Sequence, residues 1–206
     1  MLLMSRMSRM SERTTYLAFT SFVSAASAAG ATGVAIFVAG CVGAPAMKPA
    51  IPFSQAALPD AVKVPAGHKV ALESVGVGQI TYECRAKANM AGQFEWVFVG
   101  PDAKLNNRSG AQIGKYFGPP ATWQANDGSK ITGVQLAVAP AAPGSIPLQL
   151  VKANPAMGTG AMTGVSYIQR VATQGGVAPA SACDATTLSK KEIVNYRADY
   201  IFWMPN

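Results

Sequence analysis

The densest group of side chains able to bind a ligand surrounds a Gly-Pro-Pro segment in the middle of the chain. Lys115 and Tyr116 precede this segment, and Trp123 and Asp127 follow it. Aromatic rings offer a surface on which a ligand can stack, and a few polar or charged groups fix its orientation. Together with Arg170, which could hold an anion, these residues form the predicted site for a small molecule or a glycan.

Three of these residues also have a purely structural interpretation, which the sequence leaves open. Trp123 could fill the core, and Asp127 could cap a turn, since a short carboxylate readily bonds to nearby backbone N–H groups. Arg170 could form an ion pair with Asp102 or Asp199 across a sheet.

No pattern in the chain points to a reaction. His68 is the only histidine, so any Ser-His-Asp or Cys-His arrangement would have to use it, and no motif flanks it. Neither a Gly-x-Ser-x-Gly nor a Gly-x-Gly-x-x-Gly sequence is present. A carboxylate pair for glycoside hydrolysis could come from six acidic residues, but spacing does not show which of them meet: Glu73, Glu83, Glu95, Asp102, Asp127 and Asp199. We therefore predict binding without a cofactor or a metal, with an acid-using hydrolase as an alternative.

The chemistry of the N-terminal part is easier to interpret. Val38-Ala39-Gly40-Cys41 lies in an uncharged stretch, residues 14–47, behind the basic residues Arg6, Arg9 and Arg13. This pattern is typical of the lipobox of bacterial lipoproteins, in which the cysteine is lipidated and becomes the first residue of the mature chain. Several acyl chains on one residue hold a protein firmly, because each buried methylene contributes about 0.8 kcal/mol. The sequence predicts lipidation of Cys41 and a protein exported to the cell envelope and anchored to a membrane.

Two other interpretations of this segment remain open. An ordinary signal peptidase could cut after residues 44–46, Ala-Pro-Ala, or the segment could stay uncleaved as an anchor. All three place the remainder of the chain outside the cytoplasm, because positive charge stays inside. The predicted organisation is a signal peptide at 1–40, a flexible tether rich in Ala and Pro at 41–60, and one domain at 61–206.

The three cysteines fit an exported protein. Lipidation of Cys41 would leave Cys84 and Cys183 as a pair, and exported domains keep disulfides. We predict a disulfide between them. A redox-active pair and free thiols are the alternatives. Two thiols and one histidine make a poor zinc site, since structural zinc takes four ligands.

The charge pattern argues against a nucleic-acid partner. The chain carries 17 Lys and Arg against 10 Asp and Glu, a formal net charge of +7. A nucleic-acid-binding protein concentrates its basic residues in a patch or stripe. Here they are scattered singly, apart from Lys190-Lys191. Membrane lipid and a small-molecule or glycan ligand are the expected partners, with a structural or partner-binding envelope protein as the other interpretation.

Alternation with a period of two dominates from residue 62 onward and predicts half-buried strands. We expect strands at 68–75, 79–84, 94–99, 130–139, 147–153, 163–172 and 194–203, and one helical turn near 179–188. Turns are predicted at 76–78, 100–102, 106–107, 118–120, 126–129, 143–144 and 175–176, where Gly, Pro, Asn or Asp cluster. The fold class is therefore all-β, a single antiparallel β-sandwich or a partly closed β-barrel with little helix.

Several segments together resemble a family of exported bacterial and fungal proteins known as domain of unknown function 3455. The resembling segments are residues 79–84, 96–105, 118–119, 123, 127–129, 167–176, 183–184 and 196–202. They span about residues 62–204. The family pattern has histidine where this chain has Lys115, and a shorter Gly-Pro-Thr-Trp where this chain inserts Pro120 and Ala121. The resemblance implies a fold and no reaction.

Overall fold

The computed structural model describes residues 52–206, so the predicted signal peptide, Cys41 and most of the tether lie outside the described residues. Residues 52–206 belong to one compact unit. No helix between residues 52 and 206 has both the length and the apolar character of a membrane span.

Eight antiparallel strands form one sheet that closes on itself, because β1 pairs with both β2 and β8. Neighbours in the sheet are neighbours in sequence, so the barrel is built from consecutive hairpins. The prediction of a single all-β antiparallel domain is confirmed, and the closed barrel replaces the sandwich alternative. The strands are β1 (His68–Ala86), β2 (Phe94–Asn106), β3 (Gln112–Phe117), β4 (Thr122–Ala125), β5 (Lys130–Ala139), β6 (Leu148–Ala153), β7 (Tyr167–Gly175) and β8 (Lys191–Pro205).

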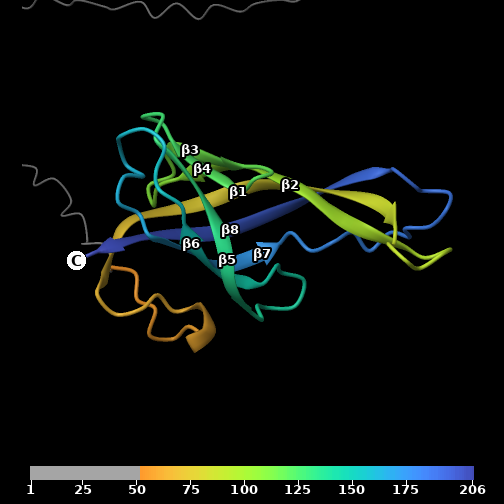
Figure 1. Ribbon diagram of the computed structural model, residues 1–206, viewed down its shortest axis with the longest axis horizontal. Coiled ribbons are helices and arrows are strands. Elements are labelled where there is room, and N and C mark those ends of the chain that lie inside the picture. The colour runs from red at the N-terminus through yellow and green to blue at the C-terminus, as the bar shows by residue number, and fades with distance from the viewer. Residues whose placement is uncertain (1–51) are drawn as a thin grey trace, which may run out of the picture. The chain divides into compact units, whose positions relative to one another are not determined.

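The strands differ strongly in length. β1, β2 and β8 have 19, 13 and 15 residues, whereas β3 and β4 have 6 and 4. In Figure 1 the three long strands run on together well beyond the short ones and end in connecting loops. The short strands and the adjoining parts of β1, β2 and β8 therefore form the barrel. The parts of β1, β2 and β8 that extend beyond the short strands form an arm.

Two predicted turns are wrong, because the glycines that suggested them lie inside strands. Residues 76–78 belong to β1, which is one strand and not two. A Cβ on Gly76 would come within 2.5 Å of the Tyr200 ring, and one on Gly78 would come within 2.2 Å of a backbone oxygen. Residues 100–102 likewise belong to β2, where a Cβ on Gly100 would meet a carbonyl oxygen of the Gly-Pro segment at 2.3 Å. These glycines permit close approach of neighbouring strands.

Alternation did not reveal β3 and β4, which are only 6 and 4 residues long. The turn between β4 and β5 does contain Asp127-Gly128, as the sequence predicts, with Gly128 at φ 89°. Among residues 52–206 the one helical turn is η1 (Asp60–Val62), a 3₁₀ helix, and the turn predicted near 179–188 is not helical.

Two apolar clusters stabilise the barrel. The larger fills the interior with alternate residues of the strands, among them Tyr116, Trp123, Ile168 and Tyr200. The smaller lies on the outer face of β5–β8 and includes Val62, Val64 and Trp203. Because successive residues of a strand face opposite sides, each of these strands contributes to both clusters.

The outer cluster is covered by the segment that leads into β1. The Phe53 ring packs edge-on against Trp203, with 6.2 Å between ring centroids. Gln55 exchanges two hydrogen bonds with the backbone of Val64 and accepts a third from the buried Gln169. Residues 53–60, which the sequence assigned to the tether, therefore contact the barrel.

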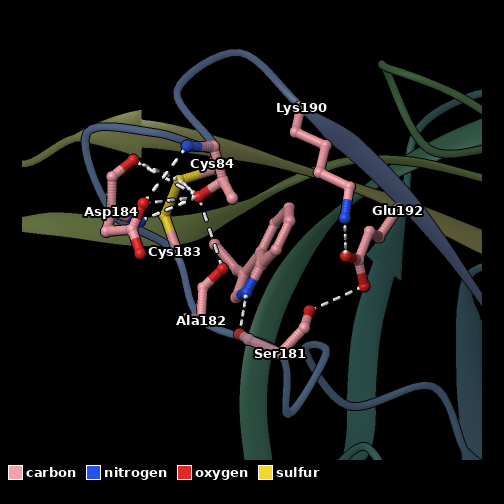
Figure 2. A network of polar contacts seen from close by, with 9 residues as sticks. Cys84, Ser181, Ala182, Cys183, Asp184, Lys190 and Glu192 are labelled. Carbon is pink, nitrogen blue, oxygen red and sulfur yellow. Dashed lines mark hydrogen bonds and ion pairs between the residues drawn. A yellow bond between two sulfur atoms is a disulfide. The ribbon is translucent and has the colours of Figure 1, made fainter.

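The arm ends at the predicted disulfide, which is confirmed: Cys84 on β1 joins Cys183 in the loop before β8, 99 residues away. We call Cys84 and residues 181–192, together with Trp96, the disulfide end. Its polar groups bond to one another, as Figure 2 shows for Ser181, Lys190 and Glu192.

Candidate functional site

A cavity of about 330 Å³ lies among interior-facing residues of β2 to β7. We call it the barrel pocket. Eight-stranded barrels have an interior just wide enough to be filled by side chains or to hold one small ligand, and this volume lies at the lower end of the usual range for ligand pockets. Its lining residues are Phe98, Pro101, Tyr116, Pro119, Ala121, Trp123, Gly133, Gln135, Gln149, Val151 and Arg170.

Two of the predicted site residues, Tyr116 and Trp123, form the aromatic wall of the pocket. They are direct cross-strand neighbours on β3 and β4. Their rings stack with centroids 4.7 Å apart, and Tyr200 packs against both. Trp123 is only 2% exposed, so the structural interpretation of this residue is correct as well.

The indole N–H of Trp123 is buried and has no hydrogen-bond partner among the described residues. Most buried donors in native proteins are paired, so an unpaired one calls for an explanation. A contrast within the molecule is Trp203, whose N–H donates to Gln169 at 2.9 Å. Trp123, which lines the pocket, thus has a buried donor for which the described part of the protein provides no acceptor.

Arg170 brings a positive charge to the same pocket. It lies on β7 two residues after the interior residue Ile168, in continuous register, and therefore faces the same side. The predicted ion pair with Asp102 or Asp199 is wrong, since no carboxylate within residues 52–206 lies within 4 Å of its guanidinium. Instead, Nε and Nη2 donate to the carbonyl oxygen of Pro147 at 3.2 and 2.9 Å.

The buried tyrosines around the pocket are affected by this charge. Burial raises the pKa of Tyr116, and the positive charge of Arg170 acts in the opposite direction. The same pair of influences, with burial the larger, raises the pKa of Tyr82. The guanidinium charge therefore acts on the barrel interior.

The other two predicted site residues do not reach the pocket. Lys115 alternates with Tyr116 on β3 and is exposed, with Nζ 5.1 Å from the centroid of the Phe117 ring. Asp127 lies in the turn after β4, where Oδ1 accepts from Ser129 Oγ and N at 2.6 and 2.9 Å. Its Oδ2 accepts from Ala161 N at 2.7 Å. The hydrogen bond from the Ser129 hydroxyl, followed by those two backbone bonds, lowers the pKa of Asp127, so this residue is a turn cap.

The lining residues that the sequence analysis did not predict include two glutamines and one phenylalanine. Gln135 and Gln149 face the pocket from β5 and β6, and the amide of Gln149 donates to Oε1 of Gln135 at 2.5 Å. Phe98 lines it from β2 and is 50% exposed, so it marks the solvent side of the pocket. A polar residue at an inward position of a strand was the available signal for the two glutamines. It was obscured by the apolar residues that stand at the outward positions of β5.

The carboxylates considered for hydrolysis do not meet in a pocket. Glu73 and Asp199 both bind Arg108, which donates at 2.8 and 2.5 Å, respectively. Partial burial acts to lower the pKa of Arg108, but its hydrogen bonds to Asp199 and Glu73 outweigh this and raise it. These three side chains form a structural ion network between the loop after β2 and strands β1 and β8.

The remaining candidates carry no further chemistry. The His68 ring lies 3.0 Å from the Pro65 carbonyl oxygen and edge-on to Tyr167, away from the pocket. No group of three His, Cys, Asp or Glu side chains in residues 52–206 is placed to hold a metal. A larger but more open hollow of about 620 Å³ contains none of the predicted site residues.

The fold and the site define a small antiparallel barrel with one partly enclosed pocket that combines an aromatic wall and a cation. The chain belongs to the family described as protein of unknown function (DUF3455), whose model matches residues 65–204. No curated protein and no solved structure matches the chain.

Proposed function

We propose that this chain is an exported, membrane-anchored lipoprotein of the bacterial cell envelope whose barrel binds a small molecule in the barrel pocket. The observation that carries the binding proposal is the convergence of Tyr116, Trp123 and Arg170 on one cavity. These residues come from three strands and were singled out by residue type alone. Their convergence supports a binding site, because ligand pockets typically combine an apolar wall with a few polar groups.

The lining of the pocket favours binding over catalysis. Apart from Tyr116, Arg170 is the one ionisable residue among the residues that line it. Burial keeps Tyr116 protonated at neutral pH by raising its pKa. General acid–base catalysis uses groups that titrate near the working pH, and a tyrosine with a raised pKa does not.

Export and anchoring rest on two observations from separate parts of the chain. The lipobox pattern at Cys41 indicates export and attachment to a membrane. The Cys84–Cys183 disulfide fits an oxidising compartment, where such bonds persist. In cells, Cys41→Ala should leave unprocessed precursor, as should treatment with an inhibitor of the lipoprotein signal peptidase. Normal processing of the mutant would contradict lipidation.

Ligand binding is tested by a thermal-shift screen of small acids, alcohols and sugars on the full-length chain in detergent. Compounds that bind the pocket should raise the melting temperature of the wild type and lose their effect in Ala121→Leu, which adds bulk to the pocket wall just before β4. Trp96→Phe is the control, because Trp96 lies at the disulfide end and donates to Ser181. A screen in which no compound distinguishes these two variants would contradict the proposal.

One observation favours a second candidate, a protein that binds a macromolecular partner. Val134, Leu136 and Val138 on β5 are 61%, 54% and 46% exposed, a concentration of apolar surface on one strand. Replacing Val134 and Leu136 with Thr should abolish capture of envelope proteins by cross-linking if this surface has a partner. Unchanged cross-links in that variant would leave the pocket as the functional site.

A further inference from the structure

We propose that the ligand of the barrel pocket is a small monocarboxylate with a flat apolar body, held by its carboxylate at Arg170. This inference rests on the proposed binding function and specifies its ligand class. It follows from the donors that line the pocket, from the apolar residues between them, and from the size of the cavity.

Some N–H groups of the Arg170 guanidinium have no acceptor among the described residues. Of its five N–H groups, two donate to the Pro147 carbonyl. The other three have no acceptor within residues 52–206, and no carboxylate there neutralises the charge. The Pro147 carbonyl fixes one side of the planar group, which leaves Nη1 and the second N–H of Nη2 available. Two parallel N–H groups match the two oxygens of a carboxylate, which is the strong bidentate arrangement.

A second, independent observation also indicates an acceptor-bearing ligand. The Trp123 N–H is buried and unpaired within the described part of the chain, and Trp123 lines the same cavity. An unmade hydrogen bond at a buried donor costs about 1–3 kcal/mol. An oxygen of a bound ligand would satisfy this donor, whereas a purely hydrocarbon ligand would not.

The apolar residues that line the pocket determine the shape and polarity of the rest of the ligand. Phe98, Pro101, Pro119, Ala121 and Val151 give the cavity an apolar wall, beside the stacked Tyr116 and Trp123 rings. A volume of about 330 Å³ suits a compact ring compound and excludes an oligosaccharide. A singly charged carboxylate also costs less to desolvate than a phosphate dianion, because the cost of burying charge rises steeply with its magnitude.

The tyrosines of the interior are consistent with an anion at this position. Burial raises the pKa of Tyr116, so its hydroxyl is a neutral group at neutral pH and does not oppose a carboxylate. Arg170 acts on the pKa of Tyr82 and Tyr116 in the opposite sense, and its guanidinium has no carboxylate counter-ion within 4 Å among the described residues. A bound carboxylate would serve as that counter-ion.

The experiment compares acids with neutral amides of the same shape. Calorimetric titration of the full-length chain in detergent uses cinnamate against cinnamamide, and benzoate against benzamide. The wild type should bind each acid about tenfold or more tightly than its amide, since a hydrogen-bonded charge pair is worth more than its neutral counterpart. Inorganic phosphate should not displace either acid.

Three variants locate the effect. In Arg170→Gln the acid-to-amide ratio should fall to about one, while the amide keeps its affinity and thereby shows that the pocket is folded. Arg170→Lys should keep part of the acid-to-amide affinity ratio, because lysine retains the positive charge but lacks the two parallel N–H groups of the guanidinium. Arg85→Gln is the control, since Arg85 is an exposed arginine on β1 that pairs with Glu83 outside the pocket.

The possible failures are distinguishable. If the wild type binds amides as tightly as acids, or takes phosphate and no ring carboxylate, the ligand class is wrong and the binding function stands. If neither acids nor amides bind, and the screen described above yields no compound specific for the pocket, the binding function itself fails. An acid preference that persists unchanged in Arg170→Gln would also overturn the assignment of the carboxylate to Arg170.

Discussion

The disulfide end and the barrel pocket treat their polar groups in opposite ways. At the disulfide end the Trp96 N–H donates to the Ser181 carbonyl, and the Ser181 hydroxyl donates to Glu192, which also pairs with Lys190. Figure 2 shows the contacts of Glu192 with Ser181 and Lys190 near the Cys84–Cys183 bond. In the pocket, the Trp123 N–H and three N–H groups of Arg170 lack acceptors within the described residues.

This difference distinguishes the disulfide end from the pocket, although Ser74, Thr173 and Asp199 also carry a buried polar atom without a partner among the described residues. Groups that only hold the fold together can be paired within the chain, and leaving them unpaired would cost free energy of unfolding. Unpaired donors persist where a ligand supplies the missing partner, because sites that bind are rarely optimised for the stability of the empty protein. Changes at the disulfide end should therefore alter stability alone, and changes in the pocket should alter binding more than stability.

The largest expected effect is the loss of the disulfide. Cys84→Ala with Cys183→Ala releases a loop closed over a separation of 99 residues, which costs about 4–5 kcal/mol of unfolding free energy in the chain-entropy model. Urea unfolding of the full-length chain measures the loss, and a reductant should reproduce it in the wild type. Affinity for cinnamate, measured where the variant is folded, should stay within a factor of two; a large drop would mean that the two regions are not independent.

The next prediction compares two buried tryptophans. Trp123→Phe and Trp203→Phe remove similar volume, and each removes an indole N–H. The Trp203 N–H serves Gln169 Oε1 at 2.9 Å, and Gln169 is fully buried, whereas the Trp123 N–H serves no described group. We expect Trp203→Phe to cost about 1–2 kcal/mol more, because it leaves Gln169 Oε1 without that donor.

Calorimetry or urea unfolding of both variants checks this difference, and equal losses would show that the Trp123 donor is satisfied in the free protein. Trp123→Ala would be the natural test of binding if the Trp123 ring were an exposed surface for stacking. It is a poor probe here because the ring is buried. Removing a side chain that is 2% exposed leaves a cavity and costs about 3–5 kcal/mol.

Much of the fold could be predicted from alternation, and the errors have a common cause. The sequences of β5 and β8 alternate, and both strands were expected close to where they lie. Gly76, Gly78 and Gly100 suggested turns, but they are close-contact positions between neighbouring strands. A single sequence does not show whether a glycine supplies conformational freedom or merely the absence of a Cβ, because that depends on strands far away in the chain.

The site could be predicted in part for a similar reason. Tyr116 and Trp123 flank one hairpin, so their contact follows from short-range sequence. Lys115 and Asp127 flank it as well, but alternation turns Lys115 outward and the turn engages Asp127. Arg170 joins the pocket through closure of the barrel, and so do Gln135 and Gln149. Spacing along one strand does not indicate which distant inward residues will share a cavity.

A smaller effect distinguishes a hydroxyl at the disulfide end from the cation of the pocket. The Thr187 hydroxyl accepts from Asp184 N at 2.9 Å and lies 3.3 Å from the Ala182 carbonyl oxygen. Thr187→Val removes these bonds at constant shape and should cost about 1 kcal/mol of unfolding free energy. Arg170→Gln should cost less, within about 0.5 kcal/mol, because its protein partner is a single exposed carbonyl. Urea unfolding of both variants measures the order, and the reverse order would make Arg170 a structural residue.

The smallest expected effect is a pH dependence at the disulfide end. Hydrogen bonds from the Thr186 hydroxyl and then from the Thr186 N–H lower the pKa of Asp184 below its ordinary value. A carboxyl whose pKa is lower in the folded than in the unfolded state stabilises the fold above its unfolded pKa, near 3.9, and loses that contribution as the pH falls toward the folded pKa. The urea concentration at the unfolding midpoint of the wild type should therefore decrease as the pH is lowered from about 4 to about 2, and it should decrease less in Asp184→Asn.

Asp127→Asn is the matched variant, since Asp127 caps a turn in the same way next to the barrel. The two effects should add in the double variant, because separate sites contribute independently. If Asp184→Asn follows the wild-type pH profile, the hydrogen bonds of Thr186 do not stabilise the carboxylate.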